Sequence, residues 1–315
     1  MDLHYLYTRF RIKLYGLLHR HPLWTKQPLA IQIDTQTYCN LNCIYCNPQN
    51  DYVQKQDKLS LETIKKLLND VKKKHWLISS AYLYMNGEPL LEDRLPQISK
   101  LVKDTLHCHT ILFTNGSIYT NRYLLADKNI DEVRFTISAA TRSTYKLIHG
   151  KDLFNDVIKT LDWLTEHKKP NQTITINYIL CQKNIHELEL WKKLFKGYNH
   201  DIRPVHDSVT QHQSKIAGDT HQAHLATNSS SRKNKYSNKR PCCNFATLHL
   251  GYNSKLMHCC VSDYIYNYGV YPEVDLDTFW KQKLKIGLNS EACKGCTTKD
   301  SNWEETFKKY VWNKT

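Results

Sequence analysis

Three cysteines stand close together in the sequence CNLNCIYC at positions 39–46. A gap of three residues and then one of two lets a single loop wrap three thiolates around one metal centre. A [4Fe–4S] cube is usually held by four cysteines, so three would leave one iron without a protein ligand. Reactive metal sites keep such an open position, whereas structural sites are closed. We therefore expect Cys39, Cys43 and Cys46 to hold a reactive iron–sulfur cluster, with Tyr45 covering it from solvent.

Structural zinc is the alternative for this loop, and it would need a fourth ligand nearby. His4, His19 and His21 precede the loop, but none of them has a convincing spacing to it. The spacing therefore favours iron–sulfur over zinc.

A second set of cysteines lies between residues 242 and 296. Two adjacent pairs, at 242–243 and 259–260, precede the sequence Cys-Lys-Gly-Cys at 293–296. Four thiolates are enough to close a second [4Fe–4S] cluster or a zinc site. Cys243 and Cys260 are plausible substitutes for their neighbours. The expected ligands are Cys242, Cys259, Cys293 and Cys296.

The remaining cysteines of the eleven, Cys108 and Cys181, stand alone in apolar surroundings and are expected in the core. The 315-residue chain shows no export signal, because Arg9, Arg11 and Lys13 interrupt the apolar residues near its start. No apolar run is long enough to span a bilayer. The expected compartment is the cytoplasm, where disulfides are disfavoured and clustered cysteines indicate metal binding.

The net charge is +14, from 44 Lys and Arg against 30 Asp and Glu. A basic balance of this size can indicate a nucleic-acid partner, and residues 232–240 are especially basic. Many lysines nevertheless fall on expected exposed helix faces, and a bias in the coding DNA would also produce this composition. Nucleic acid is therefore kept as an alternative partner.

A regular alternation of strands and helices begins near residue 29. Short apolar runs predict strands, and periodic amphipathic stretches predict helices. Repeated units of this kind predict a parallel sheet or barrel, whose chemistry lies in the loops that follow the strands. Three polar loops, starting near Cys39, Asn86 and Asn115, occupy those places. The expected strands are 30–33, 80–85, 110–114, 132–138 and 173–180, and the expected helices are 61–74, 95–106, 154–167, 185–195 and 276–284.

One further helix is expected at residues 3–18, which carry apolar residues at helical spacing. Such a helix either lies on a membrane surface or packs on the following domain and ends before Pro22; we favour packing. Its apolar positions are Leu3, Leu6, Phe10, Leu14 and Leu17.

Four segments are expected along the chain. The polar segment 206–240 lacks apolar periodicity and is interpreted as a linker, which its composition predicts to be disordered. The organisation predicted is a lead-in at 1–28, an α/β core at 29–205, this linker at 206–240, and a small cysteine-rich domain at 241–315.

The cysteine loop and the loops after the following strands together resemble the radical SAM superfamily. The resemblance rests on residues 31–46, on Asn-Gly-Glu-Pro at 86–89, on Thr-Asn-Gly at 114–116 and on Ser138. It covers about residues 29–200 and implies a partial (β/α)6 barrel. In the family the Gly-Glu-Pro motif contacts the amino group of S-adenosylmethionine, and the serine contacts its ribose. The cofactor-binding residues that the resemblance implies are Tyr45, Asn86, Gly87, Glu88, Pro89, Asn115 and Ser138.

Two positions depart from the family pattern, and both concern the ribose site rather than the cluster. Ala139 and Ala140 follow Ser138 where many relatives carry an acidic residue. His149-Gly150 stands where Arg-Gly is common.

The resemblance also implies a reaction. The open iron would bind the amino and carboxylate groups of S-adenosylmethionine, and an external electron donor would reduce the cluster. Cleavage would then give methionine and a 5′-deoxyadenosyl radical that abstracts hydrogen from a substrate. The later cysteines resemble the twitch or SPASM-like extension of these enzymes. No cysteine follows Cys296, so a single auxiliary cluster is expected.

The substrate class stays open among a peptide, a sugar and another small metabolite. Only 38 residues precede Cys39, too few for a peptide-recognition domain, so a peptide substrate would need a separate recognition protein. The alternatives are a radical SAM enzyme that modifies RNA and a non-catalytic binding module stabilised by zinc.

Overall fold

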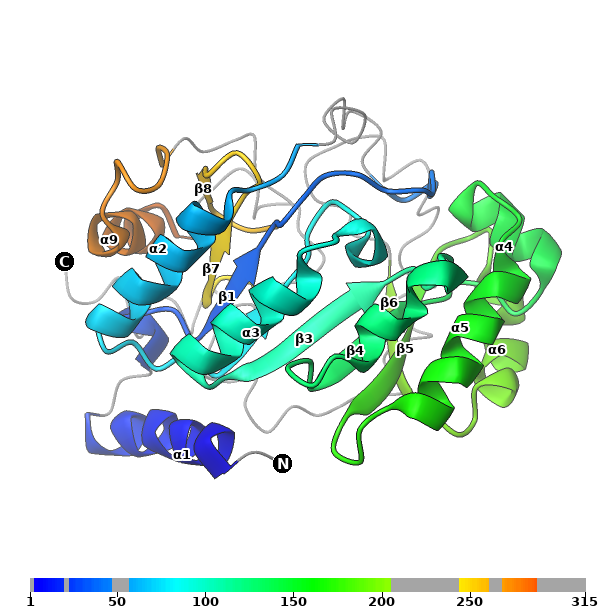
Figure 1. Ribbon diagram of the computed structural model, residues 1–315, viewed down its shortest axis with the longest axis horizontal. Helices are drawn as coiled ribbons and strands as arrows, with labels where there is room; N and C mark the ends of the chain where they lie inside the picture. The colour runs from blue at the N-terminus through cyan, green and yellow to red at the C-terminus, as the bar shows by residue number, and fades with distance from the viewer. Residues whose placement is uncertain (1–2, 20–22, 47–56, 205–243, 261–267, 288–315) are drawn as a thin grey trace.

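The computed structural model describes residues 3–19, 23–46, 57–204, 244–260 and 268–287. One sheet runs through it in the strand order β6-β5-β4-β3-β2-β1-β7-β8 (Figure 1). The first six strands are parallel neighbours in chain order, which confirms the expected α/β fold with a parallel sheet. The strands are β1 Ala30–Ile33, β2 Ser80–Tyr82, β3 His109–Thr114, β4 Glu132–Thr136, β5 Thr173–Leu180, β6 Asn199–Pro204, β7 Thr247–Leu250 and β8 Leu256–Met257.

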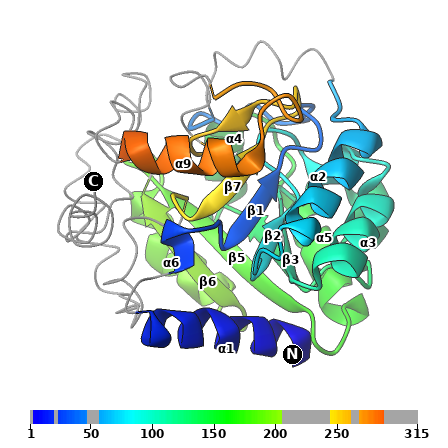
Figure 2. The same ribbon diagram turned by 90° about the vertical axis from the view of Figure 1, so that its left-hand side faces the viewer.

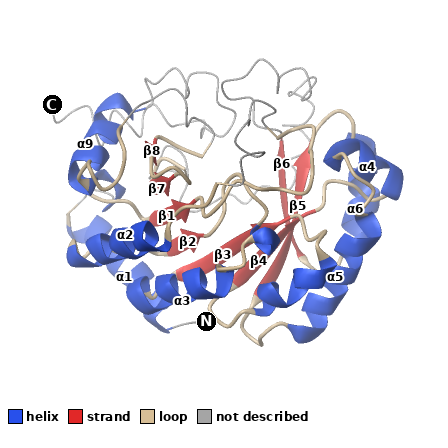
Figure 3. Ribbon diagram, turned by 45° about the horizontal axis from the view of Figure 1, so that its top comes forward, coloured by secondary structure: helices blue, strands red, loops and turns tan. Residues whose placement is uncertain are grey.

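Helices cover one face of this curved sheet (Figure 3). Helix α2 illustrates why they form: Ser60 caps it by accepting a hydrogen bond from Thr63 N at 3.0 Å, and Ile64, Leu67 and Val71 bury its apolar face. These side chains join the core cluster under the sheet. The helices are α1 Leu3–Leu18, α2 Leu61–Lys73, α3 Leu95–Leu106, α4 Arg142–His149, α5 Phe154–His167, α6 Leu188–Leu194 and α9 Leu276–Ile286.

Most expected elements are present, but some differ in their bounds or type, and strands β6, β7 and β8 were not expected. Strand β2 ends at Tyr82 and β4 at Thr136, so the residues that follow belong to loops. The helix expected at 185–195 is a 3-10 turn, Ile185–Glu187, followed by α6. Helix α4 was not expected, although Thr141 caps its start and Gly150, with a φ of 79°, ends it.

Strands β7 and β8 lie in the segment that was expected to form a small cysteine-rich domain, and they extend the core sheet. β7 pairs in parallel with β1 from Ala30↔Thr247 to Ile33↔Leu250. Helix α9 is fastened to β7 because the buried Lys283 ammonium donates to Thr247 O at 2.7 Å. The linker expected at 206–240 lies outside the described residues.

Helix α1 is present where expected and packs on the rest of the chain, but it does not do so through its apolar positions. Leu3 is 83% exposed, Phe10 59% and Leu17 72%. The face turned to the sheet instead carries Tyr5 and Thr8, and the latter is buried. Among the described residues, no helix is long and apolar enough to cross a membrane.

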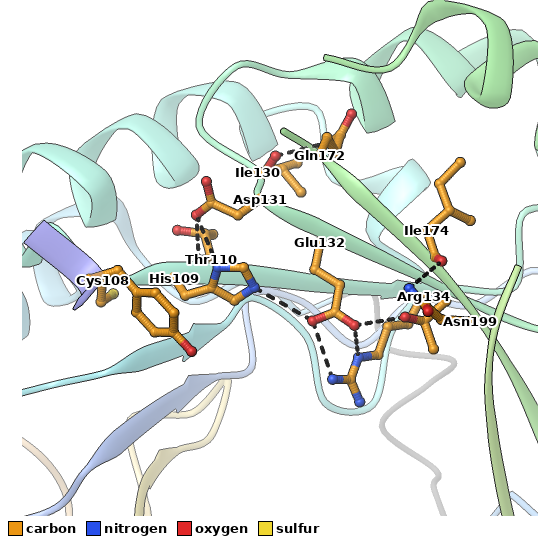
Figure 4. A network of polar contacts seen from close by, with 12 residues as sticks. Cys108, His109, Thr110, Ile130, Asp131, Glu132, Arg134, Gln172, Ile174 and Asn199 are labelled. Carbon is orange, nitrogen blue, oxygen red and sulfur yellow. Dashed lines mark hydrogen bonds and ion pairs between the residues drawn. The ribbon is translucent and has the colours of Figure 1, made fainter. Parts of the chain in front are cut away.

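A polar network closes the end of the sheet at which β3 and β4 begin (Figure 4). The Asp131 carboxylate accepts from Thr110 N at 2.8 Å and from Lys103 Nζ at 2.7 Å. Glu132 accepts from Arg134 Nε at 2.8 Å, and its other oxygen lies 3.5 Å from Nε2 of His109. This end is therefore held by ion pairs, while the opposite end carries the polar loops.

Candidate metal and cofactor site

The loops that follow β1, β2 and β3 come together at the carboxyl end of the parallel sheet. Asn115 links two of them, because its side-chain amide donates to Asn40 Oδ1 at 3.0 Å and lies 3.8 Å from Cys39 Sγ. Asn40 in turn donates to Ser117 Oγ at 2.8 Å. The structure thus brings Asn115 to the cysteine loop, as expected from its place after a strand.

The cysteine loop is also held by the end of α4. Asn42 N donates to His149 O at 3.2 Å, and Ile44 N donates to Ile148 O at 2.9 Å. Gly150 lies so close that an added Cβ would stand 2.6 Å from Asn42 O. Helix α4, which sequence reasoning missed, therefore positions the backbone between the cysteines.

The thiols of the loop lie close enough together for the charge of one to raise the pKa of another. Burial, and then the negative charge of Glu88, raise the pKa of the Cys39 thiol to about 12. Burial, followed by the charges of Cys46 and Cys39, raises the pKa of Cys43 well above its usual range. Three thiolates so close together need a cationic centre to stay ionised. The donor set of Cys39, Cys43 and Cys46 therefore fits an iron–sulfur cluster.

In the part of the chain that the structure describes, no three His, Cys, Asp or Glu side chains converge on a single metal ion. The thiolates that hold a cube attach to separate irons, so the loop need not converge in that way. Of its three cysteines, Cys46 is exposed, and Cys39 and Cys43 are partly buried.

Glu88 lies at the centre of the second loop and is buried. Its Oε1 accepts from Leu90 N at 3.0 Å and from Thr114 Oγ1 at 2.5 Å, and its Oε2 accepts from Asn115 N at 2.7 Å. Burial raises the pKa of this carboxyl to about 7, although the three hydrogen bonds act in the opposite direction. The Gly-Glu-Pro motif thus holds one carboxylate rigidly beside the cysteine loop.

Two residues that sequence reasoning did not single out shape the same loop. The Asp34 carboxylate accepts from the backbone and side-chain amides of Asn86 at 3.0 and 2.7 Å. Gln36 donates to Glu88 O at 2.8 Å and packs so closely that a Cβ on Gly87 would stand 2.4 Å from Gln36 O. Both residues lie between the end of β1 and Cys39. This position in the sequence was the signal that could have identified them.

Ser138 is a buried junction between three elements. Its hydroxyl accepts from Ile179 N at 3.0 Å and lies 3.4 Å from the Tyr45 hydroxyl. Its carbonyl accepts from Asn184 Nδ2 at 2.9 Å. The structure thereby joins Ser138 to Tyr45 of the cysteine loop, while the contact with ribose stays a prediction.

His149 joins the same junction to a cysteine. Its Nε2 accepts from Ser138 N at 3.2 Å, so the ring hydrogen is on Nδ1, which lies 3.2 Å from Cys43 Sγ. Burial lowers the pKa of His149 to about 3, so the ring is neutral at pH 7. The residue that departs from the family pattern therefore donates a hydrogen bond to a cysteine of the loop.

We expect His149→Phe to lower the reduction potential of a cluster bound to this loop. A hydrogen bond to a ligand sulfur stabilises the reduced, more negative state, and Phe cannot donate one. Phe would keep the ring that stacks on Tyr145 at 4.3 Å. A potentiometric titration followed by electron paramagnetic resonance would measure the change, with the exposed-site variant His167→Phe as control. Equal potentials in His149→Phe and in the wild type would contradict the prediction.

A carboxylate from another element holds the residues that follow Ser138. Glu187, which follows β5, accepts from Ala140 N at 2.7 Å, from Thr141 N at 3.2 Å and from Thr144 Oγ1 at 2.7 Å. Burial alone would raise the pKa of Glu187, but a hydrogen bond from the Thr141 hydroxyl, together with these three, lowers it below its usual value. The first turn of α4 is thus held by a carboxylate that is 47 residues away from Ala140.

The sheet face opposite the helices carries aromatic and charged side chains. Leu112 points into the core, so Phe113 must point to the other face. There its ring stacks on Tyr84 at 4.3 Å, and the Arg134 guanidinium lies 5.1 Å from its centroid. Arg134 is paired with Glu132 and lies 3.3 Å from Asp201.

Of the second cysteine set, only Cys259 and Cys260 lie within the described residues, and both are partly buried. They follow β8, and the charge of Cys260 contributes, after burial, to the raised pKa of Tyr84. Cys108 and Cys181 are buried, as expected. The other expected ligands, Cys242, Cys293 and Cys296, lie outside the described residues.

Comparison with known proteins points to one family. The sequence model of the radical SAM superfamily matches residues 33–195, which is 163 of the 315 residues. A GTP 3′,8-cyclase of Chlorobaculum tepidum is 25% identical over 180 residues, or 55% of this chain and 52% of that protein. A GTP 3′,8-cyclase of Clostridium acetobutylicum is 29% identical over 167 residues, or 51% and 49%. The chain thus spans about half the length of the curated relatives it matches.

Solved structures share the fold over more of the chain. SuiB of Streptococcus suis bound to S-adenosylmethionine superposes with a TM-score of 0.63 at 15% identity, covering 86% of this chain and 68% of SuiB. The protein anSMEcpe with bound AdoMet gives a TM-score of 0.61 at 13% identity, covering 91% and 97%. At these identities the likeness concerns the fold.

Proposed function

The chain belongs to the radical SAM superfamily, and from this premise we propose that it is an enzyme that cleaves S-adenosylmethionine reductively at a [4Fe–4S] cluster. Cys39, Cys43 and Cys46 are the proposed ligands. When bound and reduced, the cluster supplies the electron that breaks the sulfonium bond, giving methionine and a 5′-deoxyadenosyl radical that abstracts hydrogen from the substrate. The observation that carries the proposal is the meeting of this cysteine loop with Glu88 and Asn115.

Glu88 is the proposed partner of the amino group of S-adenosylmethionine. An ionised carboxylate offers about four lone-pair sites, and three are used by Leu90, Thr114 and Asn115. One acceptor site is therefore left for the ligand, on a group whose orientation is already set. Rigid placement of this kind lets the protein orient its ligand without further reorganisation.

Tyr45 and Ser138 are proposed to line the part of the site that holds the nucleoside of S-adenosylmethionine. Tyr45 lies next to Cys46 in sequence and edge-on to the His149 ring, with the centroids 5.9 Å apart. Together with Ile148 and Cys181, it forms a small apolar cluster beside the loop. These apolar walls would exclude water from a reactive radical.

The substrate is proposed to bind on the sheet face that carries Tyr84, Phe113 and Arg134. It remains a peptide, a sugar or another small metabolite. The named activity of the relatives, GTP 3′,8-cyclase, adds nucleotides to the classes worth testing. A peptide substrate would bring a separate recognition protein as partner.

Two further partners complete the proposal. An external electron donor would approach Cys46, which is the exposed cysteine of the loop. One auxiliary [4Fe–4S] cluster would be held by Cys242, Cys259, Cys293 and Cys296, with Cys260 as a substitute ligand near Tyr84.

The test is an assay of the purified, anaerobically reconstituted protein with dithionite and S-adenosylmethionine. We expect 5′-deoxyadenosine and methionine to form together, because cleavage of S-adenosylmethionine yields both. A reconstituted protein that holds iron but never yields 5′-deoxyadenosine would refute the enzyme proposal. A protein that holds zinc and no iron would favour the binding-module alternative.

A further inference from the structure

We propose that helix α1 docks this protein on the surface of a bilayer that contains anionic phospholipids. The docking face is a line of exposed apolar side chains, here called the α1 stripe. Spacings of four and three residues alternate along it, which places its members on one side of a helix. The α1 stripe consists of Leu3 (83% exposed), Tyr7 (56%), Phe10 (59%), Leu14 (38%) and Leu17 (72%).

The α1 stripe faces away from the protein because the other side of the helix makes the packing contacts. Tyr5 lies with its ring 5.0 Å from the ring of His109, and Thr8 is buried. Figures 1 and 2 show α1 lying along the outside of the molecule, beneath the sheet. Leu6 and Leu18 beside the stripe are exposed as well. An apolar surface of this extent usually marks an interaction site.

The charges around the α1 stripe select the partner. Arg9, Arg11 and Lys13 are exposed, and the helix contains no Asp or Glu. At about 100° per residue, Arg11 falls on one side of the stripe and Lys13 on the other. Arg9 lies farther round the helix, where its guanidinium donates to the Tyr5 hydroxyl at 3.3 Å. Long basic side chains can lay their stems on apolar surface and extend their charges outward. Apolar residues flanked by basic ones are typical of helices that lie in the headgroup region of anionic bilayers.

A second copy of the chain fits this surface less well. Two α1 helices in contact would bring their basic residues together with no acidic residue on either helix to pair with them. Anionic headgroups neutralise the same charges. Charge complementarity therefore favours the bilayer over a homodimer through α1.

Docking through α1 would leave the candidate site pointing away from the membrane. Tyr5 contacts His109, the first residue of β3, whereas the other end of β3 leads to Asn115 beside Cys39. The polar network of Figure 4 lies at the end of the sheet where β3 and β4 begin, and it includes the His109 that Tyr5 contacts. The proposal thus adds a location to the enzyme and is independent of its proposed chemistry.

The full-length protein would be tested by flotation with vesicles of phosphatidylcholine alone and of phosphatidylcholine with about one third phosphatidylserine. We expect binding to the anionic vesicles at least about tenfold above binding to the neutral ones, weakening as salt screens the charges. The double variant Phe10→Glu/Leu17→Glu should reduce anionic binding by about tenfold or more. The matched control is Leu190→Glu/Leu194→Glu on α6, which replaces two leucines that are each 50% exposed and should bind like the wild type.

Three outcomes would overturn the proposal: no vesicle binding by the wild type, equal binding to both vesicle types, or undiminished binding by Phe10→Glu/Leu17→Glu. If sedimentation velocity instead shows a dimer that this variant dissociates, the α1 stripe is a contact between copies. If hydrogen exchange shows α1 protected without vesicles in a monomer, another part of the chain covers it. Circular dichroism and retained iron would show that each variant is folded.

Discussion

Replacing Cys39, Cys43 and Cys46 together by Ala is expected to remove about four irons per chain and to abolish formation of 5′-deoxyadenosine. The three thiols are the proposed anchors of the reactive cluster, and no other cysteine lies in the loop. Loss of the cluster removes the electron that breaks the sulfonium bond, so residual activity should fall below detection rather than by a modest factor. Iron would be quantified chemically, and product by chromatography of the same samples.

The iron count also separates the two cysteine sets. About eight irons falling to about four would support an auxiliary cluster besides the reactive one. About four falling to none would favour a structural, zinc-binding role for the second set. The control is Cys108→Ala, which removes a buried thiol of the core and should leave both iron and product unchanged. Product formation by the triple variant would contradict the assignment.

Glu88→Gln is expected to weaken binding of S-adenosylmethionine by at least about tenfold. The side-chain NH2 of Gln must face either Leu90 N or Asn115 N, because Glu88 now accepts from both with different oxygens. A donor facing a donor leaves a buried group unsatisfied and costs about 1–3 kcal/mol. The variant also lacks the negative charge proposed to attract the ligand's amino group.

Binding would be measured by equilibrium dialysis of the reconstituted protein with labelled S-adenosylmethionine. Glu92→Gln is the control. Glu92 is equally buried, but its carboxylate pairs with Arg94 at 2.7 Å, whereas Asn115 N donates to Glu88. It should alter stability more than affinity. If Glu88→Gln binds as tightly as the wild type, Glu88 is not the partner of the amino group.

The raised pKa of Glu88 also predicts a pH dependence of stability. The folded-state value is about 7 against a usual value of 4.5, so the native state holds a proton that the unfolded chain releases. This contribution is fully present below pH 4.5 and is lost as the pH rises towards 7, on the order of 3 kcal/mol in all. Denaturation of the metal-free protein across this range should show the fall in the wild type and a flatter curve in Glu88→Gln. Parallel curves for the two proteins would contradict it.

The sequence was most informative where function requires residues in fixed order along one loop. The cysteine spacing, the Gly-Glu-Pro motif and Asn115 each stand directly after a strand, and parallel strands end at one edge. Local apolar patterns were therefore enough to predict that the loops beginning near Cys39, Asn86 and Asn115 lie near one another, while Glu88 was implied by the family resemblance. The core positions of Cys108 and Cys181 followed from the same patterns.

Contacts between distant segments could not be predicted in this way. Glu187 supplies a carboxylate to the loop after Ser138, and His149 reaches Cys43 from a helix that was itself missed. Glu187 has no local signal, and His149 stood out only as a departure from the family pattern, because each acts through a partner more than 40 residues away. The direction of α1 was misjudged for a related reason: helical spacing shows which residues share a face, but not which face the protein covers.

The pairing of β1 with β7 bears on how the chain can be divided. β1, which leads into the cysteine loop, has β2 on one side and β7 on the other, so its backbone is hydrogen-bonded along both edges. A fragment ending at residue 240 would lack β7 and turn β1 into an edge strand whose Ile31 and Ile33 are apolar. Such unprotected edges pair with other chains. The cysteine loop would then be carried by the part of the fragment most prone to aggregate, which makes residue 240 a poor place to cut although a polar segment ends there.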